Sequence, residues 1–335
     1  MSTTTAPTTG AGLGASGAAD PADGADGAPR RGAGVARPRL SMPVRQRLIT
    51  LLFLGPAVAY MALFFGYPLV KNIIMGFQDY TISTFFTGEA PWVGWGNYVA
   101  VITGPLFGTA LMNTIIFTIG SIAGQFLLGL GLALFFRRRF PLSGVLRSLL
   151  LLPWLIPLIV ASAVWKWLLD TETGALNRLL MSTGVVDSGI PWLSSTELAL
   201  FTVIVVNIWI GIPFNAVILH GGLQGIPEEL YEAASIDGAS RWHAFRHITW
   251  PMLRPVVSVV LVLGVVYTLK VLDVILGLTG GGPANATQIL STQAYQLSFT
   301  TFDFGQGAAV SNMLIVLALL FAVIYLRLNR RAVDE

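Results

Sequence analysis

The chain lacks cysteine altogether, so it can form no disulfide, offer no thiol nucleophile and build no thiolate metal site. It is also poor in charge, because Asp, Glu, Lys and Arg make up only 11% of its 335 residues, whereas a soluble domain usually carries about a quarter. Hydrophobic residues make up 54% of the chain. These values exclude an ordinary soluble protein and predict one embedded in a membrane.

The sequence also lacks the usual signatures of an enzyme. No lysine follows a glycine, so the GxxxxGK phosphate loop of ATPases is missing. His243 and His247 are one helical turn apart, but Ala244 stands where an HExxH zinc site needs its glutamate. A membrane enzyme would need a paired acid and base or a metal cluster, and none is visible. We therefore expect no catalytic residue, no metal site and no cofactor bound by this chain.

Six long apolar runs predict six transmembrane helices. Each has roughly the 20 residues that are needed to cross about 30 Å of hydrocarbon. The runs cover residues 48–70, 109–136, 148–168, 198–219, 256–278 and 308–326. They predict an all-α membrane protein whose transmembrane domain extends over residues 48–327.

The placement of basic residues predicts the topology. Of the 20 lysines and arginines, 16 lie before the first run, between the second and third, between the fourth and fifth, or after the sixth. Such residues accumulate on the cytoplasmic side of a membrane. Both termini and the segment 227–255 are therefore predicted to be cytoplasmic. The net charge of +3 reflects this asymmetry, so we expect no nucleic-acid partner.

The two ends of the chain are predicted to be tails. Residues 1–40 are rich in Ala, Gly, Thr, Pro and Asp and contain no apolar run, so we expect them to be disordered in the cytoplasm. They also lack the basic and apolar regions of a secretory signal. Residues 328–335 are predicted to form a short cytoplasmic tail.

Residues 227–255 form the only long polar segment in the second half of the chain. Glutamates in its first turn are favoured by the helix dipole, and Gly238 can end that helix in a left-handed conformation. A second amphipathic helix is predicted after Gly238, and we expect Pro251 and Pro255 to stop it before the next span. The pattern predicts a helix-turn-helix projection that a partner protein can hold.

The same segment resembles the permease subunits of bacterial ABC sugar importers, in the maltose, trehalose and glycerol-phosphate branch. Its residues follow the EAA-x3-G-x9-I-x-L-P spacing of that family, with Trp250 where a leucine is usual. The residues that match are Glu232, Ala233, Ala234, Gly238, Ile248 and Pro251, and Asp237 also fits the sugar-importer version of the motif.

The resemblance implies the fold, the function and the partners. Six helices, with a cytoplasmic EAA coupling helix between the fourth and fifth, would form half of a translocation pathway for a di- or oligosaccharide in a bacterial inner membrane. The EAA segment would dock on a dimeric ATPase that binds ATP and Mg²⁺. A second permease subunit, in a heterodimer, and an extracytoplasmic solute-binding protein would complete the complex. A secondary transporter or a channel is the alternative, but it leaves the EAA segment unexplained.

Polar groups inside the spans are candidates for solute contact, because they are costly in hydrocarbon. The candidates are Asn207, Trp209, Gly211, Asn215, Tyr267 and Thr268. An amide with small residues and aromatic rings suits an uncharged polyol. Helix packing through polar side chains is the alternative for the fourth run. Lys270 and Asp273 are three residues apart, which predicts an ion pair on one helix or a pair that snorkels to the interface, with a proton or ion relay as the less favoured alternative.

The segment after the fifth run opens with three glycines and a proline, which require an irregular turn. These residues are Gly280, Gly281, Gly282 and Pro283. The resemblance implies that they contact the solute-binding protein. A turn that merely ends the span is the alternative.

Overall fold

The computed structural model describes residues 42–138 and 140–329, in which the regular structure is helical apart from two isolated β-bridges. This confirms the predicted all-α fold. The predicted tail 1–40 lies outside the described residues, as do positions 330–335 of the predicted C-terminal tail. The chain divides into two compact units, Met1–Ala59 and Tyr60–Glu335. The functional features described below all lie in the second unit.

Five helical stretches are long and apolar enough to cross a membrane: Gln46–Met75, Phe107–Phe136, Ala199–Gln224, Arg241–Leu269 and Phe304–Tyr325. A sixth span is formed if the helix pair Ser143–Leu155 and Leu158–Leu168, which is bent by 96°, crosses as one. The described residues therefore contain five candidate spans, or the six predicted ones if this pair is counted as one span. The apolar run 148–168 did not predict the bend.

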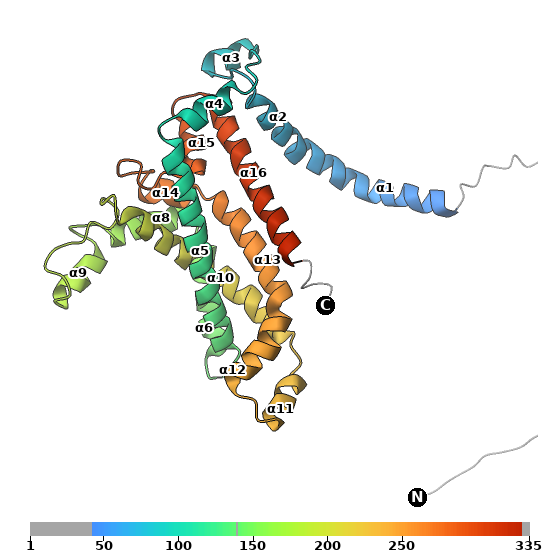
Figure 1. The fold of residues 1–335 in the computed structure, drawn as a ribbon, viewed down its shortest axis with the longest axis vertical. Helices are drawn as coiled ribbons and strands as arrows, with labels where there is room; N and C mark the ends of the chain where they lie inside the picture. The colour runs from blue at the N-terminus through green and yellow to red at the C-terminus, as the bar shows by residue number, and fades with distance from the viewer. Residues whose placement is uncertain (1–41, 139, 330–335) are drawn as a thin grey trace, which may run out of the picture. The chain divides into compact units, whose positions relative to one another are not determined.

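The helices carry the labels of Figure 1. The first three are α1 (Met42–Met61), the π-helical turn η1 (Ala62–Gly66) and α2 (Tyr67–Met75). The others are α3 (Ile82–Thr87), α4 (Gly96–Thr103), α5 (Phe107–Phe136), α6 (Ser143–Leu150), α7 (Leu152–Leu155), α8 (Leu158–Leu168), α9 (Ala175–Ser182), α10 (Ala199–Gln224), α11 (Glu229–Ile236), α12 (Arg241–Ala244), the π-helical turn η2 (Phe245–Thr249), α13 (Trp250–Leu269), α14 (Asp273–Leu278), α15 (Leu290–Phe299) and α16 (Phe304–Asn329).

Helices α5 and α10 form the most extensive helix pair. Glycines on α5 allow their close approach, because a Cβ on Gly124 would collide with Ile208 and one on Gly129 would collide with Asn215. Small residues of this kind let membrane helices pack closely where the hydrophobic effect supplies little attraction. The pair forms the centre of the second unit, and α13 packs on both members.

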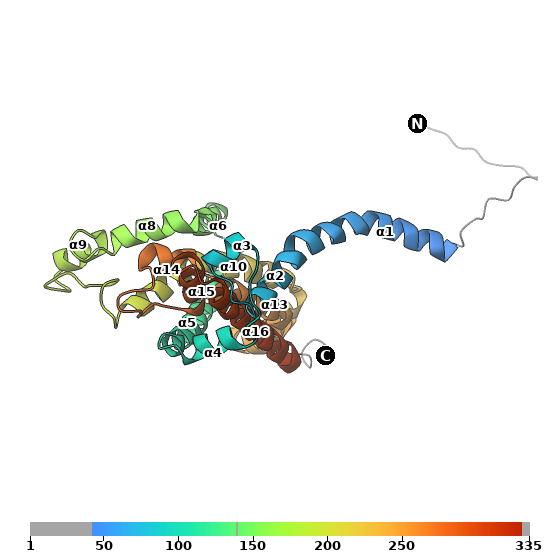
Figure 2. The same cartoon turned by 90° about the horizontal axis from the view of Figure 1, so that it is seen from above.

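The two ends of this unit carry different structures. Helices α3, α4 and α15 lie at one end of α5, and α11 and α12 lie at the other (Figure 1). Helix α14 lies beside α8 in both views (Figure 2). The glycine-rich loop joins α14 to α15. The helix-turn-helix lies at the other end of α5 from α15.

The prolines after the helix-turn-helix do not stop its second helix, so that prediction is wrong. The helical stretch runs from Arg241 to Leu269 without a break. In the π-helical turn η2 the Trp250 N–H donates to the Phe245 carbonyl. Such a wide turn makes room for a proline ring in the turn that follows. Pro251 is the second residue of α13, directly after this wide turn.

The fifth span ends earlier than predicted. Helix α13 ends at Leu269, and Asp273 begins the separate helix α14. Between the two helices, the Val271 carbonyl accepts a hydrogen bond of 2.6 Å from the Ser291 hydroxyl. This bond stabilises the non-helical conformation of the break. Lys270 and Asp273 therefore do not share a helix, and the premise of their predicted ion pair is wrong.

Candidate functional site

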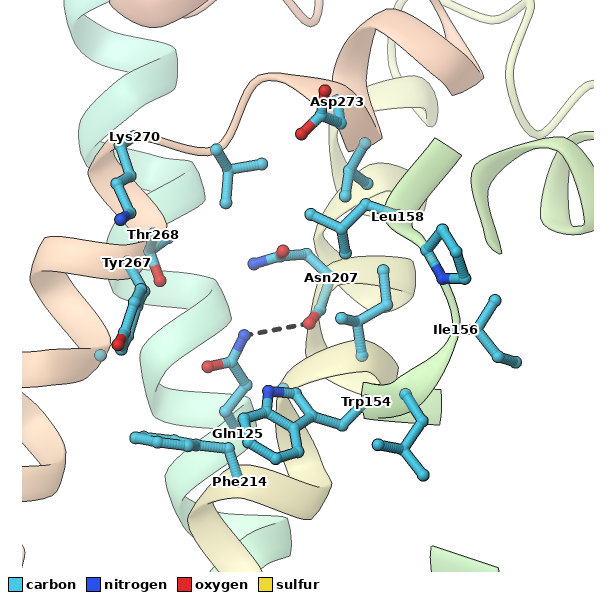
Figure 3. Close-up of a pocket in the computed structure, with 17 residues that line it drawn as sticks. Gln125, Trp154, Ile156, Leu158, Asn207, Phe214, Tyr267, Thr268, Lys270 and Asp273 are labelled. Carbon is cyan, nitrogen blue, oxygen red and sulfur yellow. Dashed lines mark hydrogen bonds between the residues drawn. The ribbon is translucent and has the colours of Figure 1, made fainter. Parts of the chain in front are cut away.

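A cavity of about 570 Å³ lies among α5, α10, α13, α14 and the break between α7 and α8. Four of the predicted candidates line it: Asn207, Gly211, Tyr267 and Thr268. Figure 3 shows the Asn207 amide pointing into this space, with Tyr267, Thr268 and Lys270 on the opposite side. Its volume lies in the usual range for small-molecule sites.

Two amide side chains define the polar wall of the cavity. Gln125 of α5 donates from Nε2 to the Asn207 carbonyl at 3.0 Å. This bond ties α5 to α10 and leaves the Asn207 side chain available. Asn207 is only 4% exposed, and its Nδ2 has no hydrogen-bond partner within the described residues. A buried donor without a partner is costly, so a solute hydroxyl that accepts from it would relieve that cost.

Aromatic rings form a second wall. Phe214 of α10 lies between Trp154 of α7 and Tyr267 of α13, with ring centroids 6.2 Å and 5.8 Å apart. All three side chains line the cavity (Figure 3). Flat rings beside amides and a threonine hydroxyl suit a ligand that has both C–H faces and hydroxyl groups.

Each sign of charge is represented once among the cavity residues, by Lys270 and Asp273. The Lys270 ammonium lies 4.9 Å from the centroid of the Tyr267 ring, a cation–π contact. Asp273 lies across the cavity, at the start of α14 (Figure 3). The walls therefore carry no excess of either charge.

The break between α7 and α8 opens one side of the cavity. Ile156 adopts an extended conformation with ψ of 132°, as a residue before proline prefers, and Pro157 caps α8. A membrane segment tolerates non-helical backbone where it lines a cavity. The bend brings Trp154 and Leu158 to the same space.

Two predicted candidates do not line the cavity. Trp209 packs edge-to-face on Trp165, with ring centroids 5.4 Å apart. Asn215 donates from Nδ2 to the Gly211 carbonyl at 3.0 Å and backs onto Gly129 of α5. Asn215 thus fits the alternative reading, in which a polar side chain helps to pack helices.

Among the amide and aromatic side chains of the cavity, three were missed from the sequence. Gln125 had a usable signal, because it is the only Gln, Glu, Lys or Arg in the apolar run 109–136. Trp154 and Phe214 had none, since aromatic residues are common throughout the spans. Their contact depends on the packing of α7 against α10.

The helix-turn-helix has the predicted form. Helix α11 ends at Ile236, Gly238 adopts φ of +77°, and the Ser240 hydroxyl accepts from the His243 N–H at 3.2 Å to cap α12. The Ala239 N–H donates to the Ala234 carbonyl at 2.8 Å, which closes the turn. Gly238 is therefore the residue that sets the angle between the two helices.

Among the residues of the EAA pattern, one packs on the helix bundle and most of the others are exposed. Ile248 packs on a buried cluster that includes Leu219 and Leu253, so it fixes the hairpin to the bundle. Glu232, Ala233, Asp237 and Gly238 are exposed, Ala234 is half-buried, and Pro251 is exposed at the start of α13. Ile236, at the tip, is 87% exposed. The exposed Ile236 side chain, on a hairpin that is packed onto the bundle through Ile248, is suited to contact a partner protein.

The two histidines of the hairpin stack on each other with ring centroids 4.0 Å apart. The His247 ring nitrogen Nδ1 lies 3.0 Å from the His243 carbonyl. Among the described residues, no group of three or more His, Asp or Glu side chains is arranged to hold a metal ion. The pair thus has no third protein ligand in that part of the chain.

The glycine-rich loop forms the irregular turn that was predicted. Gly280 and Gly281 adopt φ of +63° and +94°, and the Thr287 hydroxyl donates to the Gly282 carbonyl at 2.7 Å. Asn113 of α5 holds the loop from below. Its Nδ2 donates to the carbonyls of Asn285, Ala286 and Gln288 at 3.4, 3.1 and 3.0 Å. The loop is thus held near the end of α5 that lies away from the hairpin (Figure 1).

Sequence comparison places these features among known transport proteins. The model of the family described as binding-protein-dependent transport system inner membrane component matches residues 125–334. The trehalose/maltose transport system permease protein of Thermococcus litoralis is 38% identical over 245 residues, which are 73% of this chain and 82% of the relative. The sulfoquinovosyl glycerol transport system permease protein of Agrobacterium fabrum is 32% identical over 284 residues, which are 85% and 91% of the two chains.

Structure comparison supports the same fold. A chain in the crystal structure of a bacterial ABC transporter, involved in the import of the acidic polysaccharide alginate, matches with a TM-score of 0.75. The match covers 86% of this chain and 97% of that chain at 23% identity. At this identity the likeness concerns the fold alone.

Proposed function

Because the chain belongs to the binding-protein-dependent transport system inner membrane component family of ABC transporter permeases, we propose that it forms half of the translocation pathway for a di- or oligosaccharide. A permease of this family is a multi-pass inner-membrane protein that has no catalytic activity of its own and binds no cofactor. The trehalose/maltose permease is 38% identical to this chain, which supports a carbohydrate solute.

The cavity beside Asn207 is the observation that carries this proposal. Its unpartnered Nδ2, the Thr268 hydroxyl and the rings of Trp154, Phe214 and Tyr267 supply hydrogen bonds and flat surfaces together. A sugar presents hydroxyl groups at its edge and C–H groups on its faces. The polar wall can therefore bond the hydroxyl groups, and the aromatic wall can contact the C–H groups. Opposite charges on Lys270 and Asp273 favour a solute without net charge.

The helix-turn-helix is the proposed contact with the ATPase. The coupling surface consists of Glu232, Ala233, Ala234, Asp237 and Gly238, with Ile248 and Pro251 as its base. These residues belong to a hairpin that Ile248 packs onto the bundle and whose exposed apolar tip is Ile236. Closure of an ATPase dimer around ATP and Mg²⁺ would move the projection and favour one of two arrangements of the helices.

The proposed topology puts both termini and the hairpin in the cytoplasm. The glycine-rich loop, at the opposite end of the molecule, then faces outward, where Gly280, Gly281, Gly282 and Pro283 would contact the solute-binding protein. A second permease subunit, in a heterodimer, would supply the other half of the pathway. A secondary transporter, the alternative considered from the sequence, gives no use to the hairpin and is disfavoured by the family.

A transport assay with the assembled complex tests this function. Proteoliposomes that contain both permeases and the ATPase are loaded with ATP, and uptake of labelled di- and oligosaccharides is measured with the solute-binding protein outside. We expect uptake of at least one sugar that stops when ATP or the binding protein is omitted. Uptake at the same rate without ATP would support a secondary transporter instead.

A further inference from the structure

A second cavity, of about 630 Å³, lies between the end of α5 and the helix-turn-helix. Arg137 and Arg138 directly follow α5, and Arg241 and Trp242 come from α12. Tyr231 of α11 closes the pocket on the hairpin side. The pocket shares no residue with the cavity beside Asn207.

The charge of this pocket is strongly positive. Three arginines and no carboxylate line it. The Arg137 guanidinium lies 3.8 Å from the centroid of the Tyr231 ring, and the Tyr231 hydroxyl lies 2.8 Å from the Thr249 hydroxyl. Within residues 42–138 and 140–329, the side chains of Arg138 and Arg241 form no hydrogen bond or ion pair. Their charge is therefore free to attract an anion.

The position of the pocket indicates which anion. The apolar helix α5, which is long enough to cross a membrane, ends at Phe136, directly before Arg137 and Arg138. Basic residues directly after an apolar span typically lie at the level of the lipid phosphates.

The pocket is also lined by Leu134, Trp242 and Phe245, and the Trp242 side chain is 69% exposed. Apolar walls beside guanidinium groups suit a phosphate that carries acyl chains better than a free phosphate ion. Aromatic side chains at the membrane–water interface typically lie among the glycerol groups and headgroups of the lipids.

We propose that this pocket binds an anionic phospholipid, whose phosphate lies between the guanidinium groups of Arg138 and Arg241. Its acyl chains lie along Leu134 and Phe245. The bound lipid bridges the end of α5 and the helix-turn-helix, so it stabilises the base of the surface that we assign to ATPase contact. The cytoplasmic leaflet follows from the proposed topology, whereas the binding itself does not depend on it.

Photolabelling tests the site directly. The full-length chain, with the subunits that purify with it, is placed in phosphatidylcholine nanodiscs that contain a small fraction of photoactivatable phosphatidylglycerol. We expect labelled peptides to cover residues 134–138 and 241–249. Excess phosphatidylglycerol should compete, whereas phosphatidylcholine and inorganic phosphate should not. Competition by inorganic phosphate, or no labelling of these peptides because a subunit covers them, would overturn the proposal.

Matched variants separate the pocket from general surface charge. The pair Arg138→Gln and Arg241→Gln should lower labelling on the order of tenfold, because two charges near the phosphate are lost. The pair Arg138→Lys and Arg241→Lys keeps the charge and should label within about twofold of the unchanged chain. The pair Arg254→Gln and Arg327→Gln, at exposed arginines outside the pocket, should have no effect.

Full labelling of the glutamine pair, or an equal loss in the control pair, would contradict the proposal. Because the lysine pair preserves charge at the same positions, its labelling shows whether the pocket still folds when both arginines are changed. The assay requires neither ATP nor sugar. A failed transport experiment would therefore leave this site standing, and a failed labelling experiment would leave the transport function standing.

Discussion

Asn207 is the residue whose environment points most directly to a solute. Its Nδ2 is buried without a partner, while Gln125 binds its backbone carbonyl and holds the helix in place. We expect Asn207→Ala to raise the KM for the transported sugar by about tenfold, because one hydrogen bond to the solute is lost. Uptake by the reconstituted complex at varied sugar concentration measures this effect.

Asn215 supplies the matched control for that experiment. It lies on the same helix and is equally buried, at 4% exposed, but its amide bonds the Gly211 carbonyl and does not reach the cavity. Asn215→Ala should leave the KM within about twofold of the unchanged chain, since no solute contact is removed. Equal changes in KM for the two variants would remove Asn207 from the solute site.

Gly124 tests the close packing of α5 on α10. A Cβ there collides with Ile208, so we expect Gly124→Val to destabilise the folded chain by about 1–3 kcal/mol through overpacking. Gly131, on the same helix, has open space around it. Thermal unfolding in detergent should therefore show a lower Tm for Gly124→Val than for Gly131→Val. Equal Tm values would show that the helices can separate without cost at this point.

Single residues also show how far the sequence could lead. Asn207 and Thr268 were predictable because polar groups inside apolar runs are few and costly. Asn215 had the same signal but packs against Gly129 of α5. The sequence alone does not show which amide of a helix faces a cavity and which one faces another helix. Phe214 and Trp154 could not be predicted, because aromatic side chains are frequent in the apolar runs and no local signal shows that α7 packs on α10.

At the scale of elements, the hairpin of α11 and α12 depends on one left-handed residue. Gly238 has φ of +77°, and proline is confined to a φ near −65°. Gly238→Pro should therefore reorient the hairpin while the membrane spans remain intact. We expect sugar uptake to fall more than about tenfold, a loss of roughly 1.4 kcal/mol or more in coupling, with normal amounts of the chain in the membrane.

Gly184 provides the control for this prediction. It also adopts a left-handed conformation, with φ of +71°, but it follows α9 far from the hairpin in sequence. Gly184→Pro should retain most of the uptake. If Gly238→Pro transports normally and still purifies with the ATPase, the hairpin is not the coupling element.

Helices and turns also differ in how far they could be predicted from the sequence. The hairpin and most spans could be predicted because their signals are local: apolar runs, glutamates in a first helical turn and a glycine. The end of α13 could not, because the Ser291 hydroxyl reaches the Val271 carbonyl from a residue 20 positions away. The passage of the hairpin into α13 was also missed, since the wide turn η2 that precedes Pro251 has no simple sequence signature.

At the scale of the whole molecule, the two ends of the second unit carry separate surfaces. One end presents the glycine-rich loop held by Asn113, and the other presents the hairpin (Figure 1). The cavity beside Asn207 lies among the helices that connect them. Exposed apolar side chains such as Ile119, Leu127 and Leu319 cover these helices, as expected for surfaces that meet lipid. This arrangement suits a subunit that receives solute at one end and mechanical force at the other.

The orientation of the hairpin is the claim on which the proposed coupling depends, and accessible cysteines measure it most directly. The chain has no cysteine of its own, so each introduced thiol is unique. Ile236→Cys reports on the exposed tip of α11, and Glu89→Cys reports on an exposed position just beyond α3, at the opposite end.

Cells that produce the complete complex are treated with a membrane-impermeant maleimide, before or after they are broken open. We expect Glu89→Cys to react in intact cells and Ile236→Cys to react only in broken cells, where the bound ATPase should slow the reaction. Reaction of Ile236→Cys in intact cells would place the hairpin outside and contradict its coupling to a cytoplasmic ATPase.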